Sequence, residues 1–381
     1  MTLLVRQPGL MTSLQDLGRL GHLAQGVPPS GALDCEGLML ANALAQDRLT
    51  PSHPGDTELN VNPSLKQISR ADSRHQSKPF NGFDFRRPAL AGNSQDTVAL
   101  EMIGHGPTLE VEANSLRIAL VGFVQASLDG KPLASWRSHL LRKGQLLKLG
   151  PVEQGHVAYL AVAGGFDGPL VLGSRSTYLR AGVGLKLEPG KKLATHLGDA
   201  PSGPLLQMAV PSNWICPSLR VVEGPEIGML GKAARDDFFK AKWRISDQAD
   251  RMGIRLDGPR LAHSQKSEIA PSGLVRGCIQ VPGDGRPILL LADHQTTGGY
   301  PRVACVITAD LPLAGRLAPG SEICFECVTW AEAKTALADR KAAFQALLSS
   351  IRPIPGLDLD ALSGVNLVSG AVDALALDDM P

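Results

Sequence analysis

A polar stretch between two apolar runs carries many of the chemical groups that a site would need. It extends from Asp293 to Arg302 and holds an acid, an imidazole, an amide, two hydroxyls, a phenol and a guanidinium. The apolar runs on either side, residues 287–292 and 303–308, are each long enough for one buried strand. A connection that only reverses the chain does not need so many functional groups, and sites are usually found on loops that a rigid scaffold holds. We interpret the stretch as a functional loop; the alternative is an ordinary polar connection between core strands.

The glycines and proline of this loop predict its backbone. Gly298 and Gly299 permit positive φ angles and a close approach of the backbone to a ligand. Their consecutive amides are suited to an anion-binding concavity. Pro301 fixes one torsion and restricts Tyr300 to extended conformations. The sequence therefore predicts a loop that presents backbone N–H groups to a ligand.

Two further polar clusters precede this loop in the chain. The first is a compact turn with Asp16 and Arg19, followed by Asp34 at the start of a helical pattern. Asp34 is suited to an N-cap because its carboxylate accepts the free N–H groups of the first helical turn, and a catalytic role is the alternative. The second cluster, which contains Ser174, Arg175, Ser176 and Arg180, is suited to an anionic group, or its arginines are simply solvated.

Strand and turn patterns organise these clusters into two halves. Asp129-Gly130 and residues 282–285 predict hairpin turns, and Thr329 with Glu332 predicts a capping box at the start of a helix. Asp250-Arg251-x-Gly253 loosely echoes Asp16-x-Gly18-Arg19, and a second polar loop follows strands in each case, so we expect two related β-rich halves. The fold class is therefore mainly β with a few helices. The expected parts are a first half at 1–200 with a disordered insertion at about 47–96, a linker at 198–217, a second half at 218–330, a helix at 330–350 and an acidic flexible tail at 351–381.

Composition excludes several classes of function. The 381 residues carry a formal net charge of +1, so nothing drives the chain electrostatically to nucleic acid or membranes. The six cysteines are scattered without a complete zinc pattern, and no secretory signal opens the chain, so we expect reduced cysteines, no metal site and a cytoplasmic protein. There is no Walker phosphate loop, no dinucleotide fingerprint, no Gly-x-Ser-x-Gly elbow and no biotin-carrying lysine segment.

The motifs taken together resemble the carboxyltransferase A/B family. This family includes one component of bacterial 5-oxoprolinase and half of the carboxyltransferase domain of urea carboxylase. The resemblance implies two cyclophilin-like β-barrels in tandem, and two partner proteins: one of the kinase-inhibitor (KipI-like) type and one of the LamB/YcsF type. The matching stretches are Gln15 to Arg19, Gly31 to Asp34, Tyr159 to Gly165, Gly173 to Thr177, Leu179 to Gly182, Gly224 to Glu226, Asp250 to Gly253, Ile279 to Pro282 and Gln295 to Arg302.

The resemblance implies the hydrolysis of 5-oxoproline to glutamate, coupled to ATP. ATP is then a co-substrate, and whether magnesium accompanies its phosphates stays open. Activation of the lactam needs cations at the phosphoryl group and at the substrate carboxylate. We assign Asp293 or His294 to proton transfer. Arg302, Arg251 and Arg175 are the candidate cations, and the Gly298 and Gly299 amides would meet the developing oxyanion. The remaining substrate-binding candidates are Gln295, Thr296, Thr297, Tyr300, Arg251, Ser174, Arg175, Ser176, Asp16, Arg19 and Asp34.

Two alternatives belong to other classes. The first is a biotin-dependent carboxyltransferase of the urea-carboxylase type, which would act with a biotin carrier. The second is a non-catalytic antagonist that binds a kinase-inhibitor-like partner. The chain departs from the family pattern at the insertion, at the tail, at Tyr178, where an Asp is usual, and at Arg276, where a Pro is common.

Overall fold

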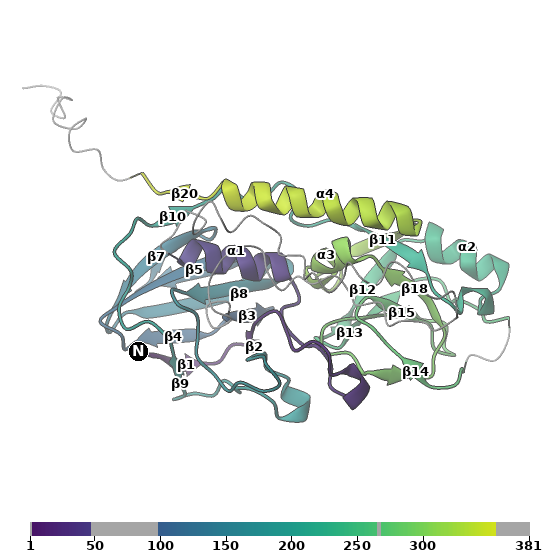
Figure 1. Cartoon of the computed structure of the whole chain (residues 1–381), viewed down its shortest axis with the longest axis horizontal. Coiled ribbons are helices and arrows are strands. Elements are labelled where there is room, and N and C mark those ends of the chain that lie inside the picture. The colour runs from purple at the N-terminus through teal and green to yellow at the C-terminus, as the bar shows by residue number, and fades with distance from the viewer. Residues whose placement is uncertain (1, 47–97, 265–267, 356–381) are drawn as a thin grey trace, which may run out of the picture.

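The computed structural model describes residues 2–46, 98–264 and 268–355. The predicted insertion at 47–96 and the tail from residue 356 onward lie outside the described residues. Within the described part, two β-rich halves lie side by side along the long axis of the molecule, and one long helix runs across both (Figure 1). None of the described helices is long and apolar enough to cross a membrane.

The first half is an eleven-stranded sheet built around two long antiparallel strands, β5 (Ser115–Leu128) and β8 (Leu146–Val162). The predicted turn at Asp129–Gly130 is confirmed: both residues have positive φ, 50° and 80°, and the chain returns directly into a paired strand. The other strands are β1 (Thr2–Gln7), β2 (Met11–Gln15), β3 (Ala99–Ile103), β4 (Thr108–Val111), β6 (Lys131–Pro132), β7 (Arg137–Arg142), β9 (Lys192–Ala194), β10 (Leu206–Gln207) and β20 (Arg352–Pro353).

The second half is a closed barrel. Its strand order is β11 (Ser218–Glu223), β18 (Arg302–Val306), β15 (Cys278–Gln280), β16 (Ile288–Leu290), β13 (Gly253–Asp257), β12 (Trp243–Ala249) and β19 (Glu322–Cys327). A small sheet joins β14 (Ser272–Gly273) to β17 (Thr297–Gly298). The barrel includes the predicted hairpin around residues 282–285, which pairs β15 with β16.

Helices cover the sheets. This confirms the predicted fold class, which is mainly β with a few helices in two β-rich halves. The helix α1 (Cys35–Ala45) is buried on nearly every side, because its residues are almost all apolar or small. The other α-helices of the described chain are α2 (Lys232–Lys240), α3 (Leu311–Gly315) and α4 (Trp330–Ser349). Short 3-10 helices lie at Leu23–Gln25, Leu179–Ala181, Ile227–Met229 and Thr308–Asp310.

The ends of the predicted domains need correction. Strand β10 lies inside the predicted linker and pairs with β7, so the linker contributes to the first sheet. Residues 352–353, predicted to belong to the flexible tail, form β20 and pair with β10. The physical reason is the length of α4, which carries the chain from the barrel back to the first half, where Ile351 is buried. Composition alone did not predict this return.

A buried ion cluster joins α1 to the second half. The guanidinium of Arg316, just after α3, donates to Asp34 at 2.6 and 2.8 Å and to Glu36 at 2.8 Å. It also stacks on Trp214, with 3.4 Å between the guanidinium carbon and the ring centroid. Arg340 of α4 reaches Glu36 from the other side. Because α1 belongs to the first half and Arg316 to the second, the cluster fixes the two halves against each other.

The helix α4 begins with a complete capping box, as its sequence predicts. The Thr329 hydroxyl accepts from the Glu332 amide, while the Glu332 carboxylate accepts from the Thr329 amide. We expect Thr329→Ala to lower the free energy of unfolding by about 1 kcal/mol, since one N-cap acceptor is lost. Thr335→Ala, in the exposed interior of the same helix, is the control and should slightly stabilise the protein, because alanine has the higher helix propensity. Chemical denaturation of both variants measures the difference, and equal effects would contradict the cap.

Candidate functional site

The first two polar clusters of the sequence converge on one carboxylate. Asp16 follows directly after β2, and its oxygens accept hydrogen bonds from the hydroxyls of Ser174 and Ser176 and from the Arg175 amide at 2.7 Å. They also accept from the Gly18 amide at 2.7 Å, which closes a tight turn. The serine cluster therefore holds an anionic group, but that group is the side chain of Asp16. Its consequence is to fix the turn that carries Arg19.

Arg19 lies buried with unused hydrogen-bond donors. Its side chain is 2% exposed, and one terminal nitrogen donates to the carbonyl of Ser176. Nε and Nη1 are buried without a partner. Burial lowers the pKa of Arg19, while Asp16 and Asp293 oppose that shift. A buried guanidinium with free N–H groups is costly unless an acceptor arrives, so these donors are suited to a ligand oxygen or anion.

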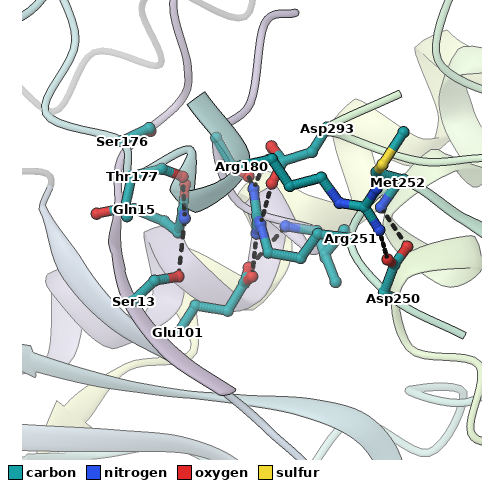
Figure 2. Close-up of polar contacts among 12 residues, drawn as sticks. Ser13, Gln15, Glu101, Ser176, Thr177, Arg180, Asp250, Arg251, Met252 and Asp293 are labelled. Carbon is teal, nitrogen blue, oxygen red and sulfur yellow. Dashed lines mark hydrogen bonds and ion pairs between the residues drawn. The ribbon is translucent and has the colours of Figure 1, made fainter. Parts of the chain in front are cut away.

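Arg251 lies at the junction of the two halves, and Figure 2 shows it between Glu101 and Asp293. It donates to both oxygens of Asp293, at 2.8 and 3.1 Å, and to the carbonyl of Gly31 at 2.7 Å. It also donates to Glu101, on β3 of the first half. Burial alone would lower the pKa of Arg251, but the two carboxylates raise it. Arg251 thus positions Asp293 and links the loop to the first half.

Glu101 is a site residue that the sequence motifs did not indicate. It is fully buried, and one oxygen accepts from the Leu33 amide and from the Tyr159 hydroxyl, both at 2.7 Å. Burial, followed by the charge of Glu101, raises the pKa of Tyr159 and keeps the phenol protonated. The position of Glu101 in the middle of an otherwise apolar strand could have indicated this role. A carboxylate buried in such a strand needs a cation and hydrogen-bond donors from elsewhere in the fold.

The faint sequence echo between the halves corresponds to a shared geometry. Asp16 accepts from the amide two residues later, Gly18, and Asp250 accepts from the amide two residues later, Met252, at 2.8 Å. Each turn presents an arginine, Arg19 or Arg251. The charge of Asp293 opposes the lowering of the Arg19 pKa by burial, and it helps to raise the pKa of Arg251. The two turns therefore place one arginine from each half within electrostatic reach of the same carboxylate.

His294 supplies a proton acceptor beside this carboxylate. Its Nδ1 lies 2.7 Å from the carbonyl oxygen of Gln295, which can only accept, so the hydrogen of the neutral ring is on Nδ1. Nε2 then carries a lone pair, and it is buried without a partner. Burial lowers the pKa of His294, and the charge of Arg276 adds to the effect, so the ring is neutral at pH 7. The ring can accept a hydrogen bond or a proton from a ligand.

The rest of the loop lies farther along the barrel. Gln295, Thr297 and Tyr300 are exposed, and Thr296 is half-buried. Arg302, predicted to stabilise charge, makes two hydrogen bonds to Glu226, at 2.8 and 2.6 Å, and one to the carbonyl of Gly273 at 3.1 Å. The guanidinium of Arg302 is therefore hydrogen-bonded within the barrel. Its catalytic role stays a prediction.

The expected backbone of the glycine pair needs correction. Neither Gly298 nor Gly299 has a positive φ, and Gly298 pairs with Ser272 in the small sheet. The need for glycine at 298 is steric, because a Cβ there would lie 2.8 Å from Leu274 Cδ1 and 2.9 Å from Gln280 Nε2. An extended strand does not form the anion-binding concavity that consecutive glycines with positive φ would form.

We expect Gly298→Ala to destabilise the protein by about 1 kcal/mol, because the ends of the Leu274 and Gln280 side chains must shift to admit the new methyl group. The control is Gly273→Ala in the partner strand, where a Cβ meets nothing within 4 Å. Thermal unfolding of both variants measures the contrast. If the two variants unfold together, Gly298 is not kept by packing.

The other predicted residues have structural contacts of their own. Asp34 caps α1, accepting from the Glu36 and Gly37 amides, and pairs with Arg316, so both oxygens are occupied. The Nε of Arg175 lies 3.5 Å from Asp167. Arg180 makes an exposed ion pair with Asp250 across the junction, at 2.9 Å. The substrate-binding roles given to these residues stay predictions.

The junction of the two halves therefore has both unpaired hydrogen-bond donors and an unpaired acceptor near the carboxylate of Asp293. Arg19 provides N–H donors, His294 provides an acceptor, and both are buried. Arg276, from the turn before β15, adds a third guanidinium that donates to the carbonyls of Ala32 and Leu33 and keeps Nε without a partner. Among the described residues no group of three or more His, Cys, Asp or Glu side chains is placed to hold a metal ion.

Comparisons with known proteins agree on one family. The model of the carboxyltransferase domain, subdomain A and B, matches residues 87–327. The chain is 32% identical to the C subunit of 5-oxoprolinase from Escherichia coli (strain K12) over 345 residues, which cover 89% of this chain and 95% of that protein. It is 26% identical to urea amidolyase of Lachancea kluyveri over 90% of this chain, but only 18% of that protein. The crystal structure of the K. lactis urea amidolyase superposes with a TM-score of 0.71 at 25% identity, covering 91% of this chain and 20% of that one.

Proposed function

This chain belongs to the carboxyltransferase domain family of subdomains A and B, and on that premise we propose that it is one component of an ATP-dependent 5-oxoprolinase. The complex would convert 5-oxoproline, ATP and water to glutamate, ADP and phosphate. Its partners would be the KipI-like protein and the LamB/YcsF-like protein that the family resemblance implies. The chain would contribute part of the site at the junction of its two halves.

The extent of the match is the observation that carries this proposal. The alignment with the C subunit of 5-oxoprolinase spans nearly the whole of both proteins, whereas the alignments with urea amidolyases cover about a fifth of those much longer chains. This extent of match favours the role of a 5-oxoprolinase component over that of a urea amidolyase. The sequence also has no lysine segment that would carry biotin.

The free groups of the junction suit a cyclic amide that bears a carboxylate. Such a molecule has an N–H donor and several oxygen acceptors, which match the acceptor at His294 Nε2 and the donors of Arg19. Asp293 is held by Arg251 through both oxygens, so we infer that His294, and not Asp293, accepts the proton. ATP would activate the lactam carbonyl, and the arginines of this chain would orient its oxygens.

The urea amidolyase relationship favours a second candidate function. The TM-score of 0.71 over 91% of this chain supports a carboxyltransferase role in which the same groups bind urea, which also presents N–H donors and a carbonyl oxygen. Biotin would then come from another protein. The third reading, a non-catalytic antagonist of a kinase-inhibitor-like partner, would leave the free donors of the junction without a use.

The test is reconstitution of the complex. The chain is co-purified with its KipI-like partner, mixed with the LamB/YcsF-like protein, and assayed for phosphate release. We expect hydrolysis of ATP that depends on 5-oxoproline and on this chain. Carboxylation of urea in the presence of a biotin carrier would instead support the second function. An assembled complex with no turnover of either substrate would contradict both.

A further inference from the structure

Two cysteines lie directly opposite each other on neighbouring strands of the barrel. The register of β15 and β18 pairs Cys278 with Cys305, so both side chains project from the same face. The Val306 amide donates to the Gly277 carbonyl at 2.9 Å, so the preceding pair is hydrogen-bonded. Along an antiparallel ladder, hydrogen-bonded pairs of residues alternate with pairs that are not hydrogen-bonded. The two cysteines therefore form a non-hydrogen-bonded pair, and the side chains of such a pair lie closer together.

This arrangement has the geometry that a disulfide requires. Opposed residues of such a pair have Cα atoms about 4.5 Å apart, which falls within the range of roughly 4.4–6.8 Å found across disulfides. Cys278 and Cys305 also belong to the same small apolar cluster. The register therefore brings the two side chains together without a change of strand pairing.

The surroundings make one of the two thiols reactive. The neighbouring Cys305 side chain lowers the pKa of Cys278, and the charge of Arg302 adds to this. The Cys305 hydrogen also has the Val306 carbonyl at 3.7 Å as an acceptor. The thiolate is the nucleophile in cysteine chemistry, so a lowered pKa favours attack on an oxidant.

The other cysteines are placed differently. Cys324 and Cys327 lie three residues apart on β19, so they project to opposite faces. Cys35 begins the helix α1, so it belongs to no strand pair, and burial raises the pKa of its thiol to about 12. Among the six cysteines, Cys278 and Cys305 are the pair that faces each other across a ladder.

We propose that Cys278 and Cys305 are a reversible oxidation site, which a hydroperoxide converts to a disulfide. The Cys278 thiolate attacks one peroxide oxygen, the O–O bond breaks, and sulfenic acid forms as hydroxide leaves. The Cys305 sulfur then attacks the oxidised sulfur, the S–S bond forms and the S–O bond breaks, and its proton leaves with the hydroxyl as water. In total two thiols are oxidised and one hydrogen peroxide is reduced to two waters.

The bond would lie beneath the polar loop of residues 293–302. Leu274 belongs to the same cluster as Cys278, and it is the residue against which Gly298 packs. Cys278 is also close enough to Arg302 and Glu226 for their charges to act on its thiol. Oxidation therefore links two strands that support the loop, and this inference does not depend on the proposed reaction.

The experiment uses the full-length chain with hydrogen peroxide as the probe. After treatment, free thiols are alkylated and the protein is digested without reduction. We expect loss of alkylation at Cys278 and Cys305 together, one peptide that joins them, and recovery of both thiols with dithiothreitol. The wild-type peptide map decides the question even where a variant folds poorly.

Variants supply the controls. Cys278→Ser and Cys305→Ser should each abolish the joined peptide, whereas Cys324→Ser should leave it unchanged. The proposal is overturned if both cysteines remain alkylated after treatment. It is equally overturned if Cys278 advances to sulfinic acid without a cross-link, or if the lost thiols are joined in other pairs.

Discussion

Replacing Arg316 with alanine is expected to lower the free energy of unfolding by about 3–5 kcal/mol, because it leaves the buried carboxylate of Asp34 without its cation and leaves Glu36 with Arg340 alone. Asp34 is 1% exposed and Glu36 is 5% exposed, so water cannot replace the guanidinium. The variant also loses the stacking on Trp214 and the hydrogen bond to its carbonyl at 2.9 Å. A loss of this size is a large share of the roughly 5–15 kcal/mol that typically stabilises a folded protein. Urea denaturation followed by fluorescence measures it.

Matched variants separate this network from charge in general. Arg6→Ala removes an ion pair with Glu110 whose arginine is mostly exposed, and should change stability by less than about 1 kcal/mol. Arg316→Lys keeps the charge but loses the bidentate hydrogen bonds to Asp34, so it should fall between the two. If Arg316→Ala is no more harmful than Arg6→Ala, the network does not hold the halves together.

The pH dependence of stability should follow from the same network. Burial alone would raise the pKa of Glu36, but Arg340 and Arg316 together lower it below 4.5. A carboxylate with a lowered pKa in the folded state stabilises the protein above its unfolded pKa and loses this effect as the pH falls through the folded pKa. Wild-type stability should therefore fall below pH 4.5 as Glu36 takes up its proton.

Local sequence patterns predicted the turns, the helix cap and the buried helix, because each of these depends on residues that are close together in the chain. The turn at Asp129–Gly130 needs only two residues with positive φ, and the capping box of α4 needs only Thr329 and Glu332. Burial of α1 followed from its apolar composition. The path of the chain after α4 was not predictable in this way, since β20 pairs with a strand that lies more than a hundred residues earlier.

Partners far apart in the chain explain which parts of the site the sequence did not predict. Arg316 and Asp34 are 282 positions apart, and Arg251 and Glu101 are 150 positions apart. Arg302 looked free in the sequence because its partner, Glu226, lies 76 positions away. The types of the residues indicated where charge would matter, but the pairing of those charges depends on the tertiary fold.

Replacing Arg19 with methionine is expected to lower the 5-oxoproline-dependent kcat/KM of the reconstituted complex by about 10- to 150-fold. This is the effect of losing one charge-assisted hydrogen bond of about 1.5–3 kcal/mol. The buried Nε and Nη1 atoms make no hydrogen bond within the described chain, so their partner on this reading is the substrate. Arg286→Ala, which removes a half-exposed ion pair with Asp257, is the control and should retain turnover.

The stability of the same variant separates a binding role from a structural one. A buried guanidinium with two unpaired groups costs free energy in the absence of ligand, so Arg19→Met should unfold at the same temperature as the wild type, or higher. Arg302→Ala should instead lower the stability, because Glu226 loses its bidentate partner. If Arg19→Met loses stability and keeps turnover, the arginine serves the fold. If Arg19→Met loses turnover at unchanged stability, the unpaired N–H groups of Arg19 serve to bind the ligand. The free energy that these unpaired groups cost in the ligand-free protein is then recovered when the ligand binds.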